Sequence, residues 1–205
     1  AIWFTGCLAT IPARGEQTDG KLAMVEFTHP AGYATPHHRH DDQDEAFYVL
    51  EGAMRGYCGE QTWRATKGSF VWLPRGIPRG YAVDGDETLR TLAITVPAGF
   101  ASFVIEAGEP AATRHLPLPG PMDIEKVAAA GARHGIVILG PPRAERQEAI
   151  VLHRKRPMPV CGVGLFPDSL SAAGICAYMG FSFRQDNPTM TIHVRPYRDD
   201  ADLAN

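Results

Sequence analysis

Turn-forming residues interrupt the first hundred residues of this chain at short and regular intervals. Glycine, proline and aspartate recur at a spacing of roughly 8–12 residues, which is typical of all-β sandwiches and barrels. The segments between them are rich in β-branched and aromatic residues and are too short for stable helices. The pattern therefore predicts an all-β fold built as a small antiparallel barrel or sandwich. Its predicted strands are 3–11, 21–28, 46–50, 54–59, 61–65, 69–73, 80–83 and 88–96.

The pattern changes after residue 96. Apolar residues at helical spacing follow Pro97 and predict a short helix over 98–107. The proline-rich segment 115–121 predicts a rigid extended linker. Asp123 is the predicted N-cap of a second helix that runs to about residue 134, and Gly135 ends it. A buried strand is predicted over 136–139.

The last third of the chain is harder to interpret. Segments 149–153, 174–184 and 189–194 could form strands, and the charge-rich stretch 143–156 could be a linker. We therefore predict a barrel domain with two trailing helices over residues 1–142. Residues 143–205 remain a C-terminal extension of uncertain packing.

Charge and composition exclude some functional classes. The formal net charge of −3 offers no basic surplus for nucleic acid, and no apolar stretch of 18 residues could span a bilayer. The first residues lack the basic start of a signal peptide. The four cysteines lie far apart without a C-x-x-C pair, which favours free thiols and a cytoplasmic location.

A cluster of histidine residues is the main candidate functional site. His37, His38 and His40 fall within four residues, and Glu45 follows shortly after them. On an extended segment, His38 and His40 point to the same side, whereas His37 points to the other. If the chain turns between His40 and Glu45, two imidazoles and one carboxylate converge. That donor set suits Fe(II) and also accommodates Mn, Ni, Co or Zn. The alternative is a solvated polar loop without a metal.

These residues stand in a recognisable motif. The pattern Gly32-x5-His38-x-His40-x4-Glu45-x6-Gly52 resembles the first signature motif of the cupin superfamily at every fixed position. Gly68-x5-Pro74-x-Gly76 resembles the start of the second. The resemblance implies a small antiparallel jelly-roll barrel that holds a divalent transition metal inside, with His38, His40 and Glu45 as ligands. Residues 3–142 are similar to single-domain cupins related to quercetin 2,3-dioxygenase.

The second motif departs from the family pattern at one position. Cupins normally carry a histidine as the fourth metal ligand where this chain has Arg79, and a guanidinium has no lone pair to give to a metal. Arg79 could turn aside and leave a three-residue metal site, or stay near the metal and bind an anionic substrate. It could also pair with Glu45 in a metal-free site. His193 is a remote candidate to supply the missing ligand.

The resemblance implies a dioxygenase that acts with dioxygen on a small aromatic substrate, flavonol-like or polyketide-like. In such enzymes the residue matching Glu45 takes a proton from the substrate as well as binding the metal.

Two alternatives remain open: a non-redox cyclase, isomerase or lyase that uses the metal or Arg79, and a small-molecule-binding cupin without turnover. We also expect a homodimer that covers exposed edge strands. Asp41 or Asp42 is a candidate to orient an imidazole. The residues expected on the barrel-lining strands are Tyr33, Phe47, Met54, Phe70, Trp72 and Tyr81.

Overall fold

The computed structural model describes residues 1–143 and 163–165, and the predicted strands over 149–153, 174–184 and 189–194 lie outside them, as does His193. The strands are β1 (Ile2–Phe4), β2 (Cys7–Ala13), β3 (Ala23–His29), β4 (His37–His40), β5 (Asp44–Glu51), β6 (Ala53–Cys58), β7 (Gln61–Thr66), β8 (Ser69–Leu73), β9 (Arg79–Val83), β10 (Leu89–Val96), β11 (Glu109–Pro110), β12 (Ile136–Gly140) and β13 (Val163–Leu165). The helices are α1 (Phe100–Ala107), α2 (Ile124–Arg133) and a short 3-10 turn at Gly15–Gln17.

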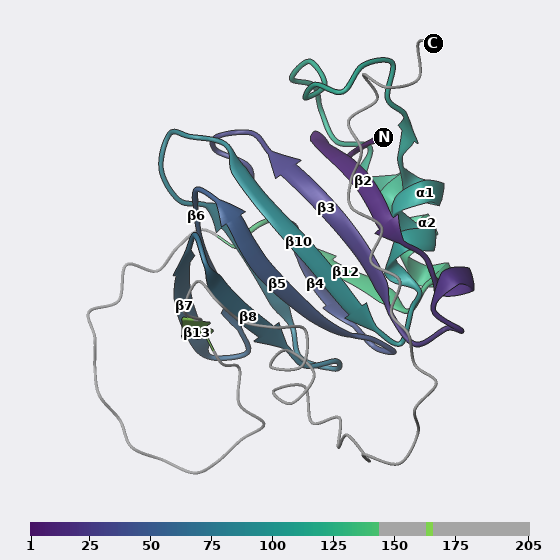
Figure 1. Ribbon diagram of the computed structural model, residues 1–205, viewed down its shortest axis with the longest axis horizontal. Helices are drawn as coiled ribbons and strands as arrows, with labels where there is room; N and C mark the ends of the chain where they lie inside the picture. The colour runs from purple at the N-terminus through teal and green to yellow at the C-terminus, as the bar shows by residue number, and fades with distance from the viewer. Residues whose placement is uncertain (144–162, 166–205) are drawn as a thin grey trace, which may run out of the picture. The chain divides into compact units, whose positions relative to one another are not determined.

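The strands form two antiparallel sheets. The larger sheet has the order β11-β1-β2-β3-β10-β5-β8-β13, and the smaller has the order β12-β4-β9-β6-β7. Neighbours far apart in sequence lie side by side, as β3, β10 and β5 do in Figure 1. The described residues therefore have the antiparallel two-sheet arrangement that the turn spacing predicts, and it is of the jelly-roll kind that the resemblance implies.

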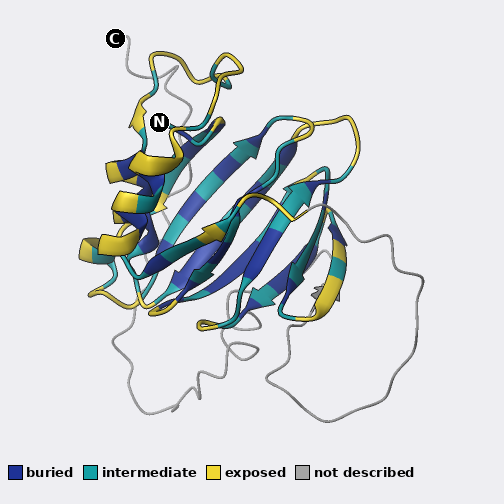
Figure 2. Cartoon of the chain, turned by 180° about the vertical axis from the view of Figure 1, so that it is seen from behind, coloured by how far each residue is buried: buried dark blue, intermediate teal, exposed yellow. Residues whose placement is uncertain are grey.

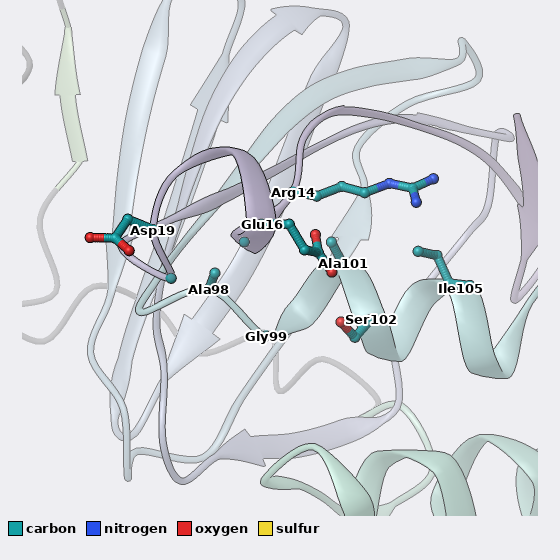
Figure 3. Close-up of a pocket in the computed structure, with 10 residues that line it drawn as sticks. Arg14, Glu16, Asp19, Ala98, Gly99, Ala101, Ser102 and Ile105 are labelled. Atoms are coloured by element: carbon teal, nitrogen blue, oxygen red, sulfur yellow. The ribbon is translucent and has the colours of Figure 1, made fainter.

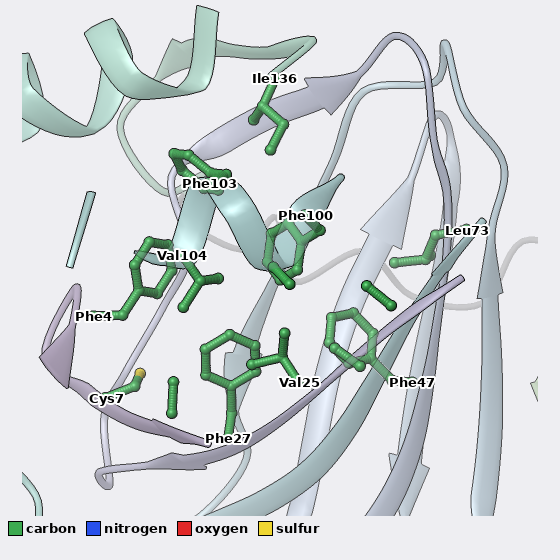
Figure 4. Packing of buried hydrophobic residues seen from close by; sticks show 14 of the residues in the cluster. Phe4, Cys7, Val25, Phe27, Phe47, Leu73, Phe100, Phe103, Val104 and Ile136 are labelled. Atoms are coloured by element: carbon green, nitrogen blue, oxygen red, sulfur yellow. The ribbon is translucent and has the colours of Figure 1, made fainter. Parts of the chain in front are cut away.

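Side-chain alternation along the strands builds the space between the sheets. In β3, the residues Ala23, Val25, Phe27 and His29 are buried and alternate with half-buried neighbours. Figure 2 shows the same alternation of buried and partly exposed positions along the other long strands. The apolar core includes Phe27, Phe47 and Phe100, which are drawn together in Figure 4. Each buried ring of this kind contributes roughly 1.5–3 kcal/mol to folding.

The two helices lie beside β2 at one side of the sheets, with their apolar faces inward and their exposed faces outward (Figures 1 and 2). In α1, Phe100, Phe103 and Val104 are buried. The predicted N-cap of α2 is confirmed, because the Asp123 carboxylate accepts a hydrogen bond from the backbone N–H of Lys126 at 3.0 Å.

The predicted all-β class with two short helices is confirmed, but three elements differ. The strand predicted over 3–11 is two strands, since the chain reverses at Thr5 and Gly6, both with positive φ. The strand that starts at Ile136 is an edge strand rather than a buried one, and Leu139 is 42% exposed. Strand β4 was not among the predicted strands. Within the described part of the chain, no helix combines the length and apolar character needed to cross a bilayer.

Candidate metal centre

Strand β4 carries two of the predicted ligands into the barrel. Its burial alternates, so that His38 and His40 are buried while His37 and Arg39 are only partly covered. The ring of His38 is held in place because its Nδ1 donates a hydrogen bond to the carbonyl of Pro36 at 2.8 Å. That bond fixes the tautomer and leaves the Nε2 lone pair free for another partner.

A short anchored loop brings Glu45 back to the histidines. The backbone N–H of Asp41 donates to the carbonyl of Gly135 at 2.7 Å, and the Gln43 side chain donates to the carbonyl of His134 at 3.1 Å. Asp44 begins β5, and its carboxylate accepts hydrogen bonds from Arg75. The predicted turn between His40 and Glu45 is therefore present, and its shape is held by residues far along the chain.

The three predicted ligands converge. One potential ligand atom from each of His38, His40 and Glu45 lies within 4.8 Å of the others, and all three residues are buried. Burial lowers the pKa of His38 to about 4 and that of His40 well below its ordinary value. Burial also raises the pKa of Glu45 to about 7, against the opposing effect of Arg79. Both imidazoles are therefore neutral at pH 7 and have lone pairs to offer.

Arg79 lies inside the barrel, opposite His38 in the β4–β9 register, and is 1% exposed. Its Nη1 donates to the carbonyl of Leu73 at 2.8 Å and its Nη2 to that of Pro74 at 2.6 Å. Nη1 also lies 3.5 Å from Oε2 of Glu45. The guanidinium does not turn aside to solvent. It is anchored mainly by the main chain and pairs more loosely with Glu45.

The donor set fits a divalent transition metal. Nδ1 of His40 is buried without a hydrogen-bond partner, and the Glu45 carboxylate has acceptor sites beyond the one that faces Arg79. The neighbouring guanidinium opposes a second cation, which weakens the site relative to one with a fourth histidine. Two imidazoles and a carboxylate could hold a metal that keeps open positions for other ligands.

The other residues named from the sequence take different places. His37 is on the opposite face of β4, where its Nδ1 bonds to the hydroxyl of Tyr57 at 2.8 Å. Asp41 pairs with Arg39, and the carbonyl of Pro36 orients the ring of His38. That Asp42 orients an imidazole stays a prediction. Of the expected lining aromatics, Phe47 and Tyr81 meet with ring centroids 5.0 Å apart.

Sequence reasoning missed two features of the barrel interior. Thr95 is buried on β10 directly opposite Glu45, and its hydroxyl has no hydrogen-bond partner. His29 is fully buried, with Nδ1 3.1 Å from Sγ of Cys7 and Nε2 3.2 Å from Oγ1 of Thr91. Strand alternation could have placed Thr95 inward, but only the register of β10 against β5 places it beside Glu45. Cys7 and Cys58 are both buried.

A pocket on the protein surface lies apart from these residues. It is formed by the turn after β2 and the start of α1, with Arg14, Asp19 and Ser102 among its lining residues (Figure 3). None of the convergent histidines or Glu45 lines it. Phe100, next to the lining residues Gly99 and Ala101, instead stacks on His40 with ring centroids 5.6 Å apart. The chemistry of the barrel is therefore separate from this pocket.

Comparisons with known proteins agree with this description. Residues 25–95 match the family described as "Cupin domain". The chain is 30% identical over 103 residues to quercetin 2,3-dioxygenase from Bacillus subtilis (strain 168). That match covers 50% of this chain and 30% of the relative, so the chain spans less than a third of the length of this curated relative.

Solved structures also give partial matches. The cupin domain of Schizosaccharomyces pombe Cnp3 is 18% identical, with a TM-score of 0.43 over 50% of this chain and 72% of that one. A predicted oxalate decarboxylase from Thermotoga maritima is 17% identical, with a TM-score of 0.43 over 44% of this chain and 80% of that one. The matched residues 25–95, which contain both motifs, are therefore a cupin domain.

Proposed function

We propose that this cupin is a metal-dependent dioxygenase whose active site is the barrel interior around His38, His40 and Glu45. The observation that carries the proposal is the convergence of these three buried side chains within 4.8 Å. The similarity to a quercetin 2,3-dioxygenase supports an aromatic substrate, flavonol-like or polyketide-like, with dioxygen as the second reactant. The homodimer and the cytoplasmic location stay predictions from the sequence.

The residues of the chain have distinct roles in this proposal. His38, His40 and Glu45 hold a divalent metal such as Fe, Ni, Mn, Co or Zn, which supplies a Lewis acid and open positions for substrate and dioxygen. Glu45 also accepts the proton of the substrate hydroxyl, a role open to a buried carboxylate in the substrate site. Arg79 stabilises negative charge on the deprotonated substrate. Apolar neighbours such as Phe47 and Phe100 limit the access of water.

Arg79 favours a second candidate function. Its guanidinium lies 3.5 Å from Oε2 of Glu45, so a fixed positive charge could polarise a carbonyl while the neighbouring carboxylate takes up a proton, without any redox step. A cyclase, isomerase or lyase would use the same residues on the same class of small molecule. Such an enzyme turns over under strictly anaerobic conditions, whereas the dioxygenase does not.

Oxygen consumption tests the proposal. The full chain, loaded in turn with Fe(II), Ni(II), Mn(II) and Co(II), is expected to consume dioxygen when quercetin is added. His38→Ala removes one of three ligands and should lower both bound metal and the rate of uptake by at least roughly a hundredfold. His37→Ala is the matched control, because the neighbouring His37 faces the other side of β4. Full turnover by His38→Ala, or metal content equal to that of the wild type, would contradict the proposal.

A further inference from the structure

Several buried polar atoms without hydrogen-bond partners lie on the residues that surround Glu45. They are Nδ1 of His40, Nε of Arg79 and Oγ1 of Thr95, and a fourth, Oε1 of Gln43, is in the loop that leads to Glu45. Within the described residues the complete set has one other member, Nε1 of Trp63. Native proteins leave few such atoms unpaired, because each loses its hydrogen bonds to water without compensation. The atoms on His40, Arg79 and Thr95 belong to residues placed next to Glu45, which indicates a position that receives a polar ligand.

Thr95 faces this position directly. It is the cross-strand partner of Glu45 in the β10–β5 register, and direct partners in antiparallel strands project to the same face with their Cβ atoms about 4.5–5.5 Å apart. That face is the interior, since Thr91 on the same side of β10 bonds to the buried His29. Thr95 itself is 1% exposed. Its hydroxyl is thus enclosed beside Glu45 and makes no bond to the protein.

Arg79 reaches the same carboxylate from the opposite sheet. Its two terminal nitrogens are held by the carbonyls of Leu73 and Pro74, while its Nε–H has no acceptor. The guanidinium is permanently charged, and the single carboxylate of Glu45 would have to balance it together with any divalent ion. With such an ion bound, the barrel centre would carry a surplus of positive charge, and the Nε–H of Arg79 and the hydroxyl of Thr95 lack partners in either case. A ligand that carries a negatively charged oxygen can accept hydrogen bonds from both groups.

We propose that Thr95 is a substrate-contacting residue which, with Nε of Arg79, binds an anionic oxygen group of the substrate, a carboxylate or an enolate, beside Glu45. This rests on the proposed function in taking the barrel interior as the substrate site, and it narrows the substrate class to small organic anions. Thr95 provides a hydroxyl that donates to the anion, and Arg79 provides the charge and a second donor.

Isosteric substitution separates this role from a structural one. Thr95→Val keeps the shape of the side chain and removes the hydroxyl. In the Ni(II)-loaded full chain we expect it to weaken benzoate binding at least roughly tenfold by calorimetry, the loss typical of a hydrogen bond to a charged group. Thr95→Ser should restore affinity to near the wild-type value. Benzamide, the neutral analogue, should bind the wild type much more weakly and should not respond to Thr95→Val.

The stability of the same variants supplies an independent readout. Thr95→Val should unfold in urea at the same or a higher midpoint than the wild type, because it removes a hydroxyl that has no partner. Thr91→Val is the matched control on the same strand and face. Because Thr91 bonds to His29, this variant should unfold at a lower midpoint and bind benzoate as the wild type does.

Each contrary result has a definite meaning. Unchanged benzoate affinity in Thr95→Val, equal binding of benzamide and benzoate, or no benzoate binding to the wild type would overturn the inference. A lower urea midpoint with unchanged affinity would assign Thr95 a structural role. If the wild type takes up no Ni(II) but the metal-free chain shows the predicted benzoate series, the metal-dependent function fails while the Thr95 inference holds.

Discussion

The buried histidines of the barrel fall into two kinds. His40 has a ring nitrogen without a partner, and His38 has one nitrogen bonded to a carbonyl and the other free to face Glu45. His29, in contrast, has both nitrogens engaged, by Cys7 and by Thr91. The first kind has lone pairs available for a ligand. The second is a structural histidine, and its pKa affects stability rather than chemistry.

His29 predicts a stability that depends on pH. Burial lowers its pKa to about 3 from an ordinary value of 6.5, and the groups around it, Cys7, Tyr33 and Tyr81, carry no negative charge at neutral pH. Between these two pKa values the unfolded chain binds a proton that the folded chain rejects. The free energy of unfolding should therefore fall as pH drops below about 6.5, by up to roughly 1.4 kcal/mol per pH unit from this residue.

Urea unfolding of the chelator-treated full chain between pH 7 and pH 4 measures this dependence. His29→Gln cannot bind the proton, so its stability should start lower at pH 7 and fall less steeply than that of the wild type. His115→Gln, at an exposed position, should keep the wild-type slope. Parallel slopes for the wild type and His29→Gln would show that His29 stays neutral in both states or is not buried.

At the scale of elements, the position of the ligand-bearing strands depends on hydrogen bonds from a distant part of the chain. The loop between β4 and β5 is held by the carbonyls of His134 and Gly135, which follow α2, and we call this contact the clamp. The histidine spacing and the turn before Glu45 were predictable, because both are local properties of the sequence. The clamp could not be predicted, since it joins residues more than ninety positions apart.

The strand predicted over 3–11 failed for a different reason: the turn at Thr5 and Gly6 interrupts an otherwise continuous apolar pattern.

Gly135 provides a test of the clamp. Its φ of +68° suits glycine, and an added Cβ would meet the carboxylate of Asp42 in the ligand loop. Gly135→Ala should therefore lower the free energy of unfolding by roughly 1–2 kcal/mol and also displace the loop. We expect its affinity for Ni(II), measured by calorimetry, to fall roughly tenfold or more.

Gly6→Ala is the control for backbone strain alone. Gly6 has a similar positive φ of +84°, but nothing lies within 4 Å of an added Cβ. It should destabilise the chain to a similar degree and leave the affinity for Ni(II) unchanged. Equal affinities for both variants would show that the clamp does not position the ligands.

For the described part of the molecule as a whole, the candidate ligands connect two sheets. His38 and His40 belong to the five-stranded sheet, and Glu45 belongs to the eight-stranded one. The motif located these three residues because it lies on two strands that are consecutive in the sequence. It could not show that Arg79 is anchored by Leu73 and Pro74, nor that Thr95 faces Glu45, because both depend on how distant strands pair. A bound metal would hold the two sheets together and stabilise the folded state.

Arg79→His tests whether this connection is limited by the guanidinium. The substitution removes a positive charge beside the site and offers a fourth imidazole where cupins normally have one. Chelator competition should show Ni(II) bound roughly ten- to a hundredfold more tightly than by the wild type, with a larger rise in Tm on addition of the metal. Arg79→Met removes the charge without offering a ligand, so its affinity should lie between the two. Both variants leave the carbonyls of Leu73 and Pro74 without their donor and should be less stable than the wild type in the absence of metal. If Arg79→His binds Ni(II) no better than Arg79→Met, the imidazole does not reach the site. If both variants bind Ni(II) more weakly than the wild type, the anchored arginine supports the metal centre instead of opposing it. Its positive charge then does not limit the affinity for Ni(II).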